Sequence, residues 1–233
     1  MPPLRTMTWD EPKAVSDVLK YELASEFCHD VGIIASGSGV LEIGTLIGQI
    51  TRGSAGSADK SGGNTGNGTF VLDNTTPLLP GAKVGIYTLR CVAAAANAGT
   101  FRLVDPDGFV LGDYTIAGGS GGTVTVQNDI KGVLTDGGTD FEVGDGFDIT
   151  VAAGSKKWVK YVHGAVESGD DLGILLAKVD ATAADRQTVV LARGPAVLSR
   201  LGILWDASVD SDAKKAQAIA LLAKKNIIVR DSA

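Results

Sequence analysis

Residues 44–52 read GTLIGQITR, and the sixteen residues that follow, at 53–68, read GSAGSADKSGGNTGNG. The first stretch alternates in the manner of a half-buried strand. The second contains six glycines and is expected to break that strand. A strand of the same character, GILLAKV at 173–179, follows only after more than a hundred further residues. This pattern predicts a small β module that is split by an insertion.

Such a split is physically reasonable because loop-closure entropy rises slowly, by about 0.6 kcal/mol for each doubling of loop length. A self-contained domain can therefore occupy a surface loop of the module. The predicted organisation has three parts: an extended N-terminal arm at 1–26, the split module at 27–52 and 158–233, and an inserted β domain at 53–157.

The composition predicts a mainly β fold. The 233 residues are 44% hydrophobic and include 31 glycines, while aromatic residues make up only 6%. The formal net charge is −6, and no segment is basic enough to attract nucleic acid through its phosphates. The sequence shows neither the apolar region of a signal peptide nor a run long enough to span a membrane. We expect a chain that folds in a cytosol, without a nucleic-acid or membrane partner.

The insertion itself is predicted to be an antiparallel sandwich or a barrel-like domain without helices. Its strand candidates are TFVLD, VGIYTLRCVAA, TFRLVD, FVLGDYTIA, TVTVQ and FDITVAA, all between residues 69 and 153. The separators NAG, DPDG, GGSGG and DGGTD are typical of hairpin turns and loops.

After the insertion, the strand pattern resumes at Trp158 and ends in a single predicted helix. This helix should run from about 211 to 225, with Asp210 or Ser211 as its N-cap and Asn226 as a left-handed C-cap, followed by a strand at 227–230. Its apolar face is expected to contain Ala216, Ile219, Ala220, Leu222 and Ala223. The residues expected to pack in the core or between subunits are Ile174, Leu176, Leu204, Trp205 and Leu222.

The N-terminal arm combines three prolines in its first twenty residues with more apolar side chains than a purely solvated tail needs. These side chains are Leu4, Met7, Trp9, Val15, Val18 and Leu19. We interpret them as the part of the arm that contacts a partner surface.

No catalytic site is predicted. Cys28 and His29 are adjacent, so in an extended segment their side chains point to opposite faces and do not form a thiol–base pair. His163 is the only other histidine, which leaves little material for a catalytic triad or a histidine-rich metal centre. Cys28 and Cys91 fall in separate modules, so two buried or half-buried free thiols are favoured over a disulfide.

Acidic and glycine-rich motifs also favour loops over ligand sites. The DPDG at 105–108 does not have the spacing of an EF-hand loop, and a weak calcium site formed by Asp136, Asp140 and Asp145 is the less favoured alternative to simple turns. The stretch GSGVLEIG at 37–44 lacks the Lys-Ser/Thr ending of a phosphate-binding loop. Neither a metal nor a cofactor is predicted.

Three segments of the split module together resemble the head decoration proteins of lambda-like tailed phages. They are VLKYELASEFCHDVGIIASGSGVLEIGTLIGQIT at 18–51, LGILLAKVDATAADRQTVVLARGPAVL at 172–198 and LGILWDASVDSDAKKAQAIALLAKKNIIVR at 201–230. The resemblance lies in their order: a strand pair, GIL…VDATA, V…RGPA, LW, a helix and a closing strand.

The resemblance implies a small β-rich, β-tulip-like module that forms a homotrimer on the outer surface of the virion. Such a trimer sits at threefold axes of the expanded capsid, binds the major capsid protein and stabilises the shell against the pressure of packaged DNA. In this family the N-terminal arm orders on the capsid surface. The inserted domain departs from the shortest family members, and its role is not implied by the resemblance.

Two other functions are considered. The insert is alternatively a carbohydrate-binding or host-surface-binding module that is displayed outward, for which solvent-facing aromatic residues on one sheet would be the supporting feature. The aromatic residues considered for this feature are Tyr87, Phe101, Phe109, Tyr114, Phe141 and Phe147. A cysteine hydrolase is the third function, and it is disfavoured because Cys28 and His29 are adjacent.

Overall fold

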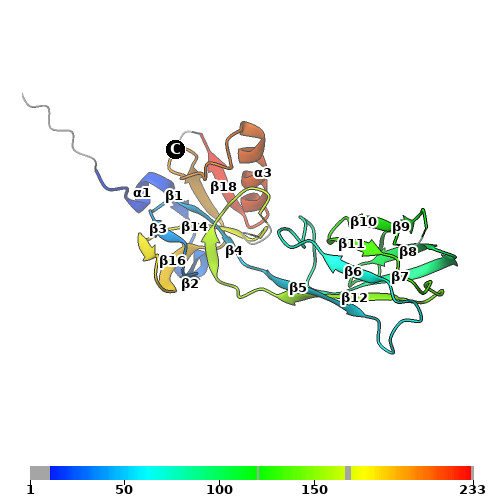
Figure 1. The fold of residues 1–233 in the computed structure, drawn as a ribbon. Coiled ribbons are helices and arrows are strands. Elements are labelled where there is room, and N and C mark those ends of the chain that lie inside the picture. The colour runs from blue at the N-terminus through cyan, green and yellow to red at the C-terminus, as the bar shows by residue number, and fades with distance from the viewer. Residues whose placement is uncertain (1–10, 120, 166–168, 232–233) are drawn as a thin grey trace, which may run out of the picture. The chain divides into compact units, whose positions relative to one another are not determined.

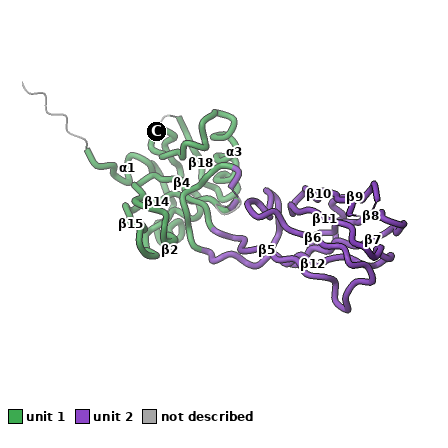
Figure 2. The backbone as a smooth tube through the Cα atoms, viewed as in Figure 1, with its two compact units in different colours: residues 1–49, 157–163, 170–233 green, residues 50–156, 164–169 purple. Residues whose placement is uncertain are grey.

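The computed structural model describes residues 11–119, 121–165 and 169–231 (Figure 1). The chain is mainly β, with 46% of its residues in strands and 9% in helices, which confirms the predicted fold class. It forms two compact units, coloured separately in Figure 2. The described residues of unit 1 lie within 1–49, 157–163 and 170–233, and those of unit 2 within 50–156 and 164–169.

Unit 1 is built on a closed five-stranded barrel. Its strands, in order, are β13 (Trp158–Lys160), β2 (His29–Ile34), β16 (Arg186–Leu191), β14 (Leu172–Leu175) and β4 (Leu46–Gln49). The strands on either side of the insertion are direct neighbours, because Ile174 of β14 pairs with Leu46 of β4 and Trp158 of β13 pairs with Gln49. A two-stranded ribbon, β3 (Gly39–Leu41) and β15 (Val179–Ala181), completes this half of the unit.

Trp158 packs in the barrel core at the point where the chain returns from unit 2. Its side chain is buried with Ile34 and Val190. A Cβ atom on Gly32 would lie 2.9 Å from Cδ1 of the indole, and a Cβ on Gly173 would lie 3.1 Å from its Cζ3. The two glycines therefore provide the space that the indole fills.

A three-stranded sheet and a helix form the other half of unit 1. The sheet order is β1 (Leu19–Glu22), β17 (Ala196–Ser199), β18 (Ile227–Arg230), with an antiparallel and then a parallel pair. Helix α3 (Asp212–Ala223) begins after Ser211, whose hydroxyl accepts a hydrogen bond from the backbone N–H of Lys214. The predicted helix, its N-cap at Ser211 and the left-handed Asn226 (φ 59°) are confirmed.

The packed face of α3 differs from the predicted one. Ala218 and Leu222 are its buried residues, and Leu221 packs against the same core. The predicted members Ala216, Ala220 and Ala223 are exposed. The difference arises because α3 packs on β14 and β18 along a narrow strip, so that only part of its apolar surface is covered.

The N-terminal part of unit 1 is more ordered than an extended arm reaching residue 26. A one-turn helix α1 (Val15–Val18), strand β1 and a second one-turn helix α2 (Ser25–Cys28) follow one another, and β1 pairs with β17. Residues 15–28 therefore belong to the folded unit. The physical reason is burial, since Val18 is fully enclosed in the core.

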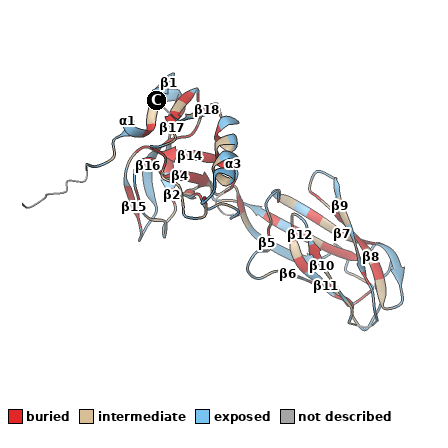
Figure 3. Cartoon of the chain, turned by 90° about the horizontal axis from the view of Figure 1, so that it is seen from above, coloured by how far each residue is buried: buried red, intermediate tan, exposed pale blue. Residues whose placement is uncertain are grey.

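Unit 2 consists of two antiparallel sheets around its own core. One sheet has the order β5 (Arg52–Asp59), β12 (Gly146–Ala153), β7 (Gly85–Ala95), β8 (Ala98–Val104), β9 (Val110–Ile116). The other has the order β10 (Thr123–Gln127), β11 (Lys131–Thr135), β6 (Thr69–Leu72). Buried positions alternate with half-buried or exposed ones along much of β7 and β8 (Figure 3), as expected for sheets that cover a core on one face.

The two sheets of unit 2 are linked at both edges by side chains. The Ser57 hydroxyl on β5 donates to the Phe70 carbonyl oxygen on β6 at 3.1 Å. The Asn128 amide nitrogen, next to β10, donates to the Leu111 carbonyl oxygen on β9 at 2.9 Å. These links join the edges of the two sheets, which remain separate layers of a sandwich.

The glycine-rich stretch at 53–68 is not a break throughout. Its first part lies in strand β5, which pairs with β12 so that Ala55 faces Val151 and Ser57 faces Ile149. The sequence of β5 contains only small and polar residues after Arg52, so its strand character comes from backbone pairing with β12 rather than from its own apolar periodicity.

Candidate interaction surfaces

The predicted arm residues fall into three groups. Leu4, Met7 and Trp9 lie outside the described residues. Val15 is at the surface of α1, with 36% of its area exposed. Val18 is fully buried and Leu19 packs against the same core. The structure thus places Val18 in the interior of unit 1, where it is not available to a partner, and Leu19 at the partly exposed margin of the same core.

The residues predicted for core or subunit packing are mostly core residues. Ile174 and Leu222 are fully buried, and Leu176 is nearly so. Leu204 and Trp205 are half-buried, and Trp205 packs against the same core. The backbone N–H of Leu204 donates to the carbonyl oxygen of Gly44 at 2.8 Å, which ties this segment to the barrel.

A first exposed apolar surface, the barrel patch, consists of Val31, Ile33 and Val189. Val31 and Val189 are direct partners across β2 and β16. Val31 is 74% exposed, and the other two side chains are about 40% exposed. Two β-branched residues that face each other in solvent form a contiguous patch suited to contact with another protein surface.

A second surface, the sheet patch, consists of Tyr21, Val197 and Ile228. They form one row across the sheet, since Tyr21 pairs with Val197 and Val197 pairs with Ile228. Tyr21 is 57% exposed and Ile228 is 50% exposed. The neighbouring positions Leu198 and Ile227 are buried on the opposite face of the same sheet.

Sequence reasoning did not identify either patch. The signal was present in part: in VGII at 31–34 and in IIV at 227–229, apolar residues occupy both faces of a strand. Such a strand has one more apolar face than the core of a single subunit needs. Which of the two faces remains open depends on the tertiary packing, and the local sequence does not specify it.

Cys28 and His29 have separate partners. The Cys28 thiol is buried, with Sγ 3.7 Å from the carbonyl oxygen of Pro195. His29 Nε2 lies 2.6 Å from a carboxylate oxygen of Glu22 on β1, an ion pair when the imidazole is protonated. His163 Nδ1 lies 3.3 Å from the Tyr161 hydroxyl. As predicted, Cys28 and the likewise buried Cys91 are free thiols.

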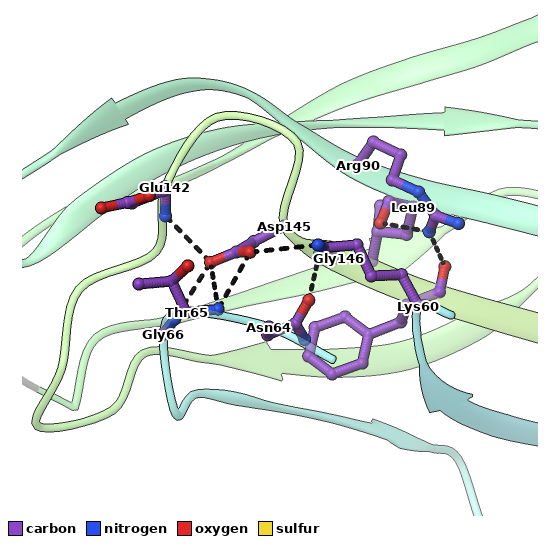
Figure 4. Close-up of polar contacts among 10 residues, drawn as sticks. Lys60, Asn64, Thr65, Gly66, Leu89, Arg90, Glu142, Asp145 and Gly146 are labelled. Carbon is purple, nitrogen blue, oxygen red and sulfur yellow. Dashed lines mark hydrogen bonds and ion pairs between the residues drawn. The ribbon is translucent and has the colours of Figure 1, made fainter. Parts of the chain in front are cut away.

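The acidic residues of unit 2 hold loops. Asp145 accepts hydrogen bonds from the backbone N–H groups of Thr65, Gly66 and Glu142 at 3.0–3.1 Å (Figure 4). Its carboxylate also lies 3.6 Å from the Lys60 ammonium. This node fastens the end of the glycine-rich stretch to the turn before β12.

Burial acts to raise the pKa of Asp145, but the hydrogen bonds from Glu142, Gly66 and Thr65 and the nearby Lys60 outweigh it, so this pKa lies below its usual range. Among the other residues of the suggested calcium site, Asp140 accepts a hydrogen bond from the backbone N–H of Asn97 at 2.8 Å. Within the described ranges, no group of three or more acidic, histidine or cysteine side chains is arranged to hold a metal ion.

The aromatic residues of unit 2 are largely internal. Tyr87, Phe101, Phe141 and Phe147 are buried in the core, and Tyr114 packs against it. Phe109 is exposed, at 66%, and lies beside the ammonium group of Lys83. A row of solvent-facing aromatic residues, the feature that would favour carbohydrate binding, is therefore not present among these six residues.

The outer face of the five-stranded sheet carries a row of charged residues. Arg90 on β7 and Arg102 on β8 are direct cross-strand partners, although both are cationic. Each is neutralised by an acid on its other side: Arg90 by Asp148 on β12, and Arg102 by Asp113 on β9 through two contacts of 2.8 Å. The four residues form a charged row that crosses four strands.

None of the helices within the described residues is long and apolar enough to cross a membrane.

Two crystal structures of FlgL from Xanthomonas campestris, in space groups H3 and C2, are 21% and 22% identical to this chain, with TM-scores of 0.30 and 0.28. Each match covers 49% of this chain. In turn, this chain spans about a third of the FlgL chains, 34% and 33%. TM-scores this low support no conclusion about fold or function. The curated proteins give no match.

The family comparison is more informative. The protein-family model for bacteriophage lambda head decoration protein D matches residues 8–227, which include the described parts of unit 1 up to β18. The match also extends across the insertion. Because it spans far more than half of the sequence, the chain belongs to the bacteriophage lambda head decoration protein D family.

Proposed function

We propose that this protein binds the outside of the expanded phage head as a homotrimer at threefold axes. In this proposal it contacts the major capsid protein and stabilises the shell against the pressure of packaged DNA. The N-terminal arm is the main binding element, and assembly takes place in the host cytoplasm.

Membership of the head decoration family carries this proposal. It supports a capsid decoration function, a location on the virion surface and a structural rather than a catalytic role. A second function for the insert, glycan binding, is not favoured by the burial of its aromatic residues.

The exposed apolar surface of unit 1 supports the trimer. The barrel patch and the sheet patch leave valine, isoleucine and tyrosine side chains in water, and contact with another copy would bury them. A cyclic trimer in which one patch of each copy contacts the next copy would cover such surfaces without leaving an open end. Three arms per trimer would then act together, and their combined affinity exceeds that of one arm through effective concentration.

Co-sedimentation with expanded and unexpanded capsids tests the decoration function. We expect the full chain to sediment with expanded capsids only. A variant that lacks residues 1–10 is expected to stay folded, because Val18 and the rest of the described core remain, and to lose capsid binding. If the truncated protein binds as tightly as the full chain, the arm is not the binding element. If the full chain sediments with neither capsid form, the decoration proposal is wrong.

Analytical ultracentrifugation tests the trimer and the barrel patch. The double variant Val31→Ser, Val189→Ser is expected to shift the free protein from trimer toward monomer. A matched control is Val71→Ser, Val133→Ser, because these two valines are also exposed and are also direct cross-strand partners, but on unit 2. The control is expected to remain a trimer. If the two double variants have the same oligomeric state, the barrel patch is not part of the subunit contact.

A further inference from the structure

The segment that precedes strand β1 contacts the turn at 199–204 more closely than a larger residue permits. A Cβ atom on Gly202 would lie 2.4 Å from the carbonyl oxygen of Asp17 and 2.7 Å from Cα of Val18. Both are backbone atoms, so they cannot swing aside as the end of a flexible side chain can. Gly202 itself is held in its turn by a hydrogen bond from its N–H to the carbonyl oxygen of Ser199 at 3.0 Å.

Gly44 connects this contact to the barrel. A Cβ atom on Gly44 would lie 2.5 Å from the Gly202 carbonyl oxygen and 2.9 Å from Cγ2 of Val18. Gly44 has a φ of +87°, which favours glycine in its own right. Its N–H donates to the carbonyl oxygen of Leu175, and its carbonyl oxygen accepts from Leu204, both at 2.8 Å. The turn and α1 are thus packed on the framework of the barrel.

Lys13 adds a polar contact at the same place. Its ammonium nitrogen donates to the Gly202 carbonyl oxygen at 2.7 Å, and the residue is half-buried within an otherwise exposed segment. Next to it, a carboxylate oxygen of Asp17 accepts the backbone N–H of Ala14 at 2.9 Å, which closes the turn that begins α1. A helix of one turn is not stable alone in water, so these contacts are what hold residues 13–18 in place.

We propose that Lys13, Val18, Gly44 and Gly202 form an arm seat, which fixes the point and direction at which the N-terminal arm leaves unit 1. This inference rests on the proposed role of the arm in capsid binding. The predicted arm residues Leu4, Met7 and Trp9 lie within nine residues of Lys13, and nine residues span at most about 32 Å when fully extended. With so short a tether, the position of its origin decides which part of a capsid surface the arm reaches and how concentrated it is there. Lys13 and Gly202 are positioning residues in this scheme.

The test uses the full chain and two variants of the seat. Gly202→Ala introduces the Cβ that collides with α1, and Lys13→Met removes the ammonium group but keeps most of the side-chain length. Gly138→Ala is the matched glycine control, since Gly138 has open space around its Cβ position and no positive φ. Lys20→Met, at an exposed lysine on β1, is the matched lysine control.

Hydrogen exchange of residues 11–18 gives a readout that does not depend on capsids. We expect exchange to be about tenfold faster or more in Gly202→Ala and Lys13→Met, and to match the wild type in both controls. Lys13→Arg keeps a donor of similar reach and is expected to restore slow exchange. Trypsin cleavage after Lys13 should likewise be faster in Gly202→Ala than in the wild type. If hydrogen exchange and trypsin cleavage are unchanged in the seat variants, the arm seat does not hold this segment and the proposal is wrong.

Capsid affinity, measured well below the melting temperature of every variant, tests the positioning role. We expect the two seat variants to bind expanded capsids about tenfold or more weakly, with Lys13→Arg and the two controls close to the wild type. If the seat variants unfold at lower temperature but bind as the wild type does, the seat is only a packing contact and the positioning role is wrong. If the wild type fails to bind capsids, the proposed function fails, while the exchange data still decide whether the seat holds the segment.

Discussion

Leu46 on β4 and Ile174 on β14 are direct partners across an antiparallel strand pair, although more than a hundred residues separate them in the sequence. The nearer pair Gln49 and Trp158 brackets the insertion still more closely. Everything between these last two residues, apart from Lys157, belongs to unit 2 by its internal contacts. The two ends of the insertion are therefore joined to adjacent antiparallel strands of the barrel.

The first prediction is that the insert can be removed. Replacement of residues 51–156 by a short Gly/Ser linker should leave unit 1 folded, because the linker only has to connect two strands that already pair, as in a β-hairpin. Circular dichroism during urea unfolding should show a single cooperative transition. A gradual loss of signal would mean that unit 1 depends on unit 2.

The second prediction concerns the core of unit 1. Leu222→Ala should lower the free energy of unfolding by about 2–5 kcal/mol, because Leu222 is fully buried on the packed face of α3. Leu201→Ala serves as the control, since Leu201 is 85% exposed, and should change it by no more than about 0.5 kcal/mol. Similar values for both variants in urea unfolding would contradict the packing of α3.

The third prediction concerns Trp158 and its glycines. Gly32→Ala should lower the free energy of unfolding by about 1–3 kcal/mol, because the added Cβ would lie 2.5 Å from Cγ2 of Val190 and 2.9 Å from Cδ1 of Trp158. Combining it with Val190→Ala removes one of these contacts and should recover part of the loss. A double-mutant cycle measures this coupling, and additive effects would show that the two positions do not compete for space.

The fourth prediction is a pH dependence of unit 2. The pKa of Asp145 is lower in the folded protein than the value of about 3.9 for an unperturbed aspartate. Its stabilising contribution is therefore complete above that unfolded value, and it is lost as the pH falls through the lower folded value. Asp145→Asn should destabilise unit 2 at pH 7 by about 1–3 kcal/mol, since an amide leaves some backbone donors unpaired.

The difference between wild type and Asp145→Asn should shrink as the pH is lowered below about 4. Thermal unfolding from pH 3 to pH 7 measures it. Asp59→Asn, at an exposed aspartate on β5, is the control and should stay within about 0.5 kcal/mol of the wild type at pH 7. A difference for Asp145→Asn that is the same at every pH would show that its ionisation does not stabilise the fold.

Local sequence signals predicted the parts of this fold that local rules determine. The Ser211 cap and Asn226 marked both ends of α3, and the alternation at 44–52 marked β4, whose partner resembles it at 173–179. Strand β5 was missed because its small residues show no apolar period, and its pairing with β12 supplies its structure.

The candidate surfaces depended on contacts that no local window contains. Val18 has the sequence character of an arm residue, and it is buried because Gly44 and Gly202, both distant in sequence, allow the chain to approach. Val31 and Ile33 alternate with buried residues in a strand that is apolar on both sides. Their exposure follows from the closure of the barrel, which determines which side of β2 faces inward.

The hydrogen bonds from Ser57 to Phe70 and from Asn128 to Leu111 have a consequence for particles as well as for single molecules. A decorated capsid would carry many copies of unit 2 at high local density, and open sheet edges at such density recruit one another into intermolecular strands. Each of these two bonds engages a carbonyl oxygen of an edge strand and ties that strand to the other sheet of the same copy, which opposes its pairing with a neighbouring copy. Unit 2 is thereby suited to dense display on virions that must stay dispersed in solution.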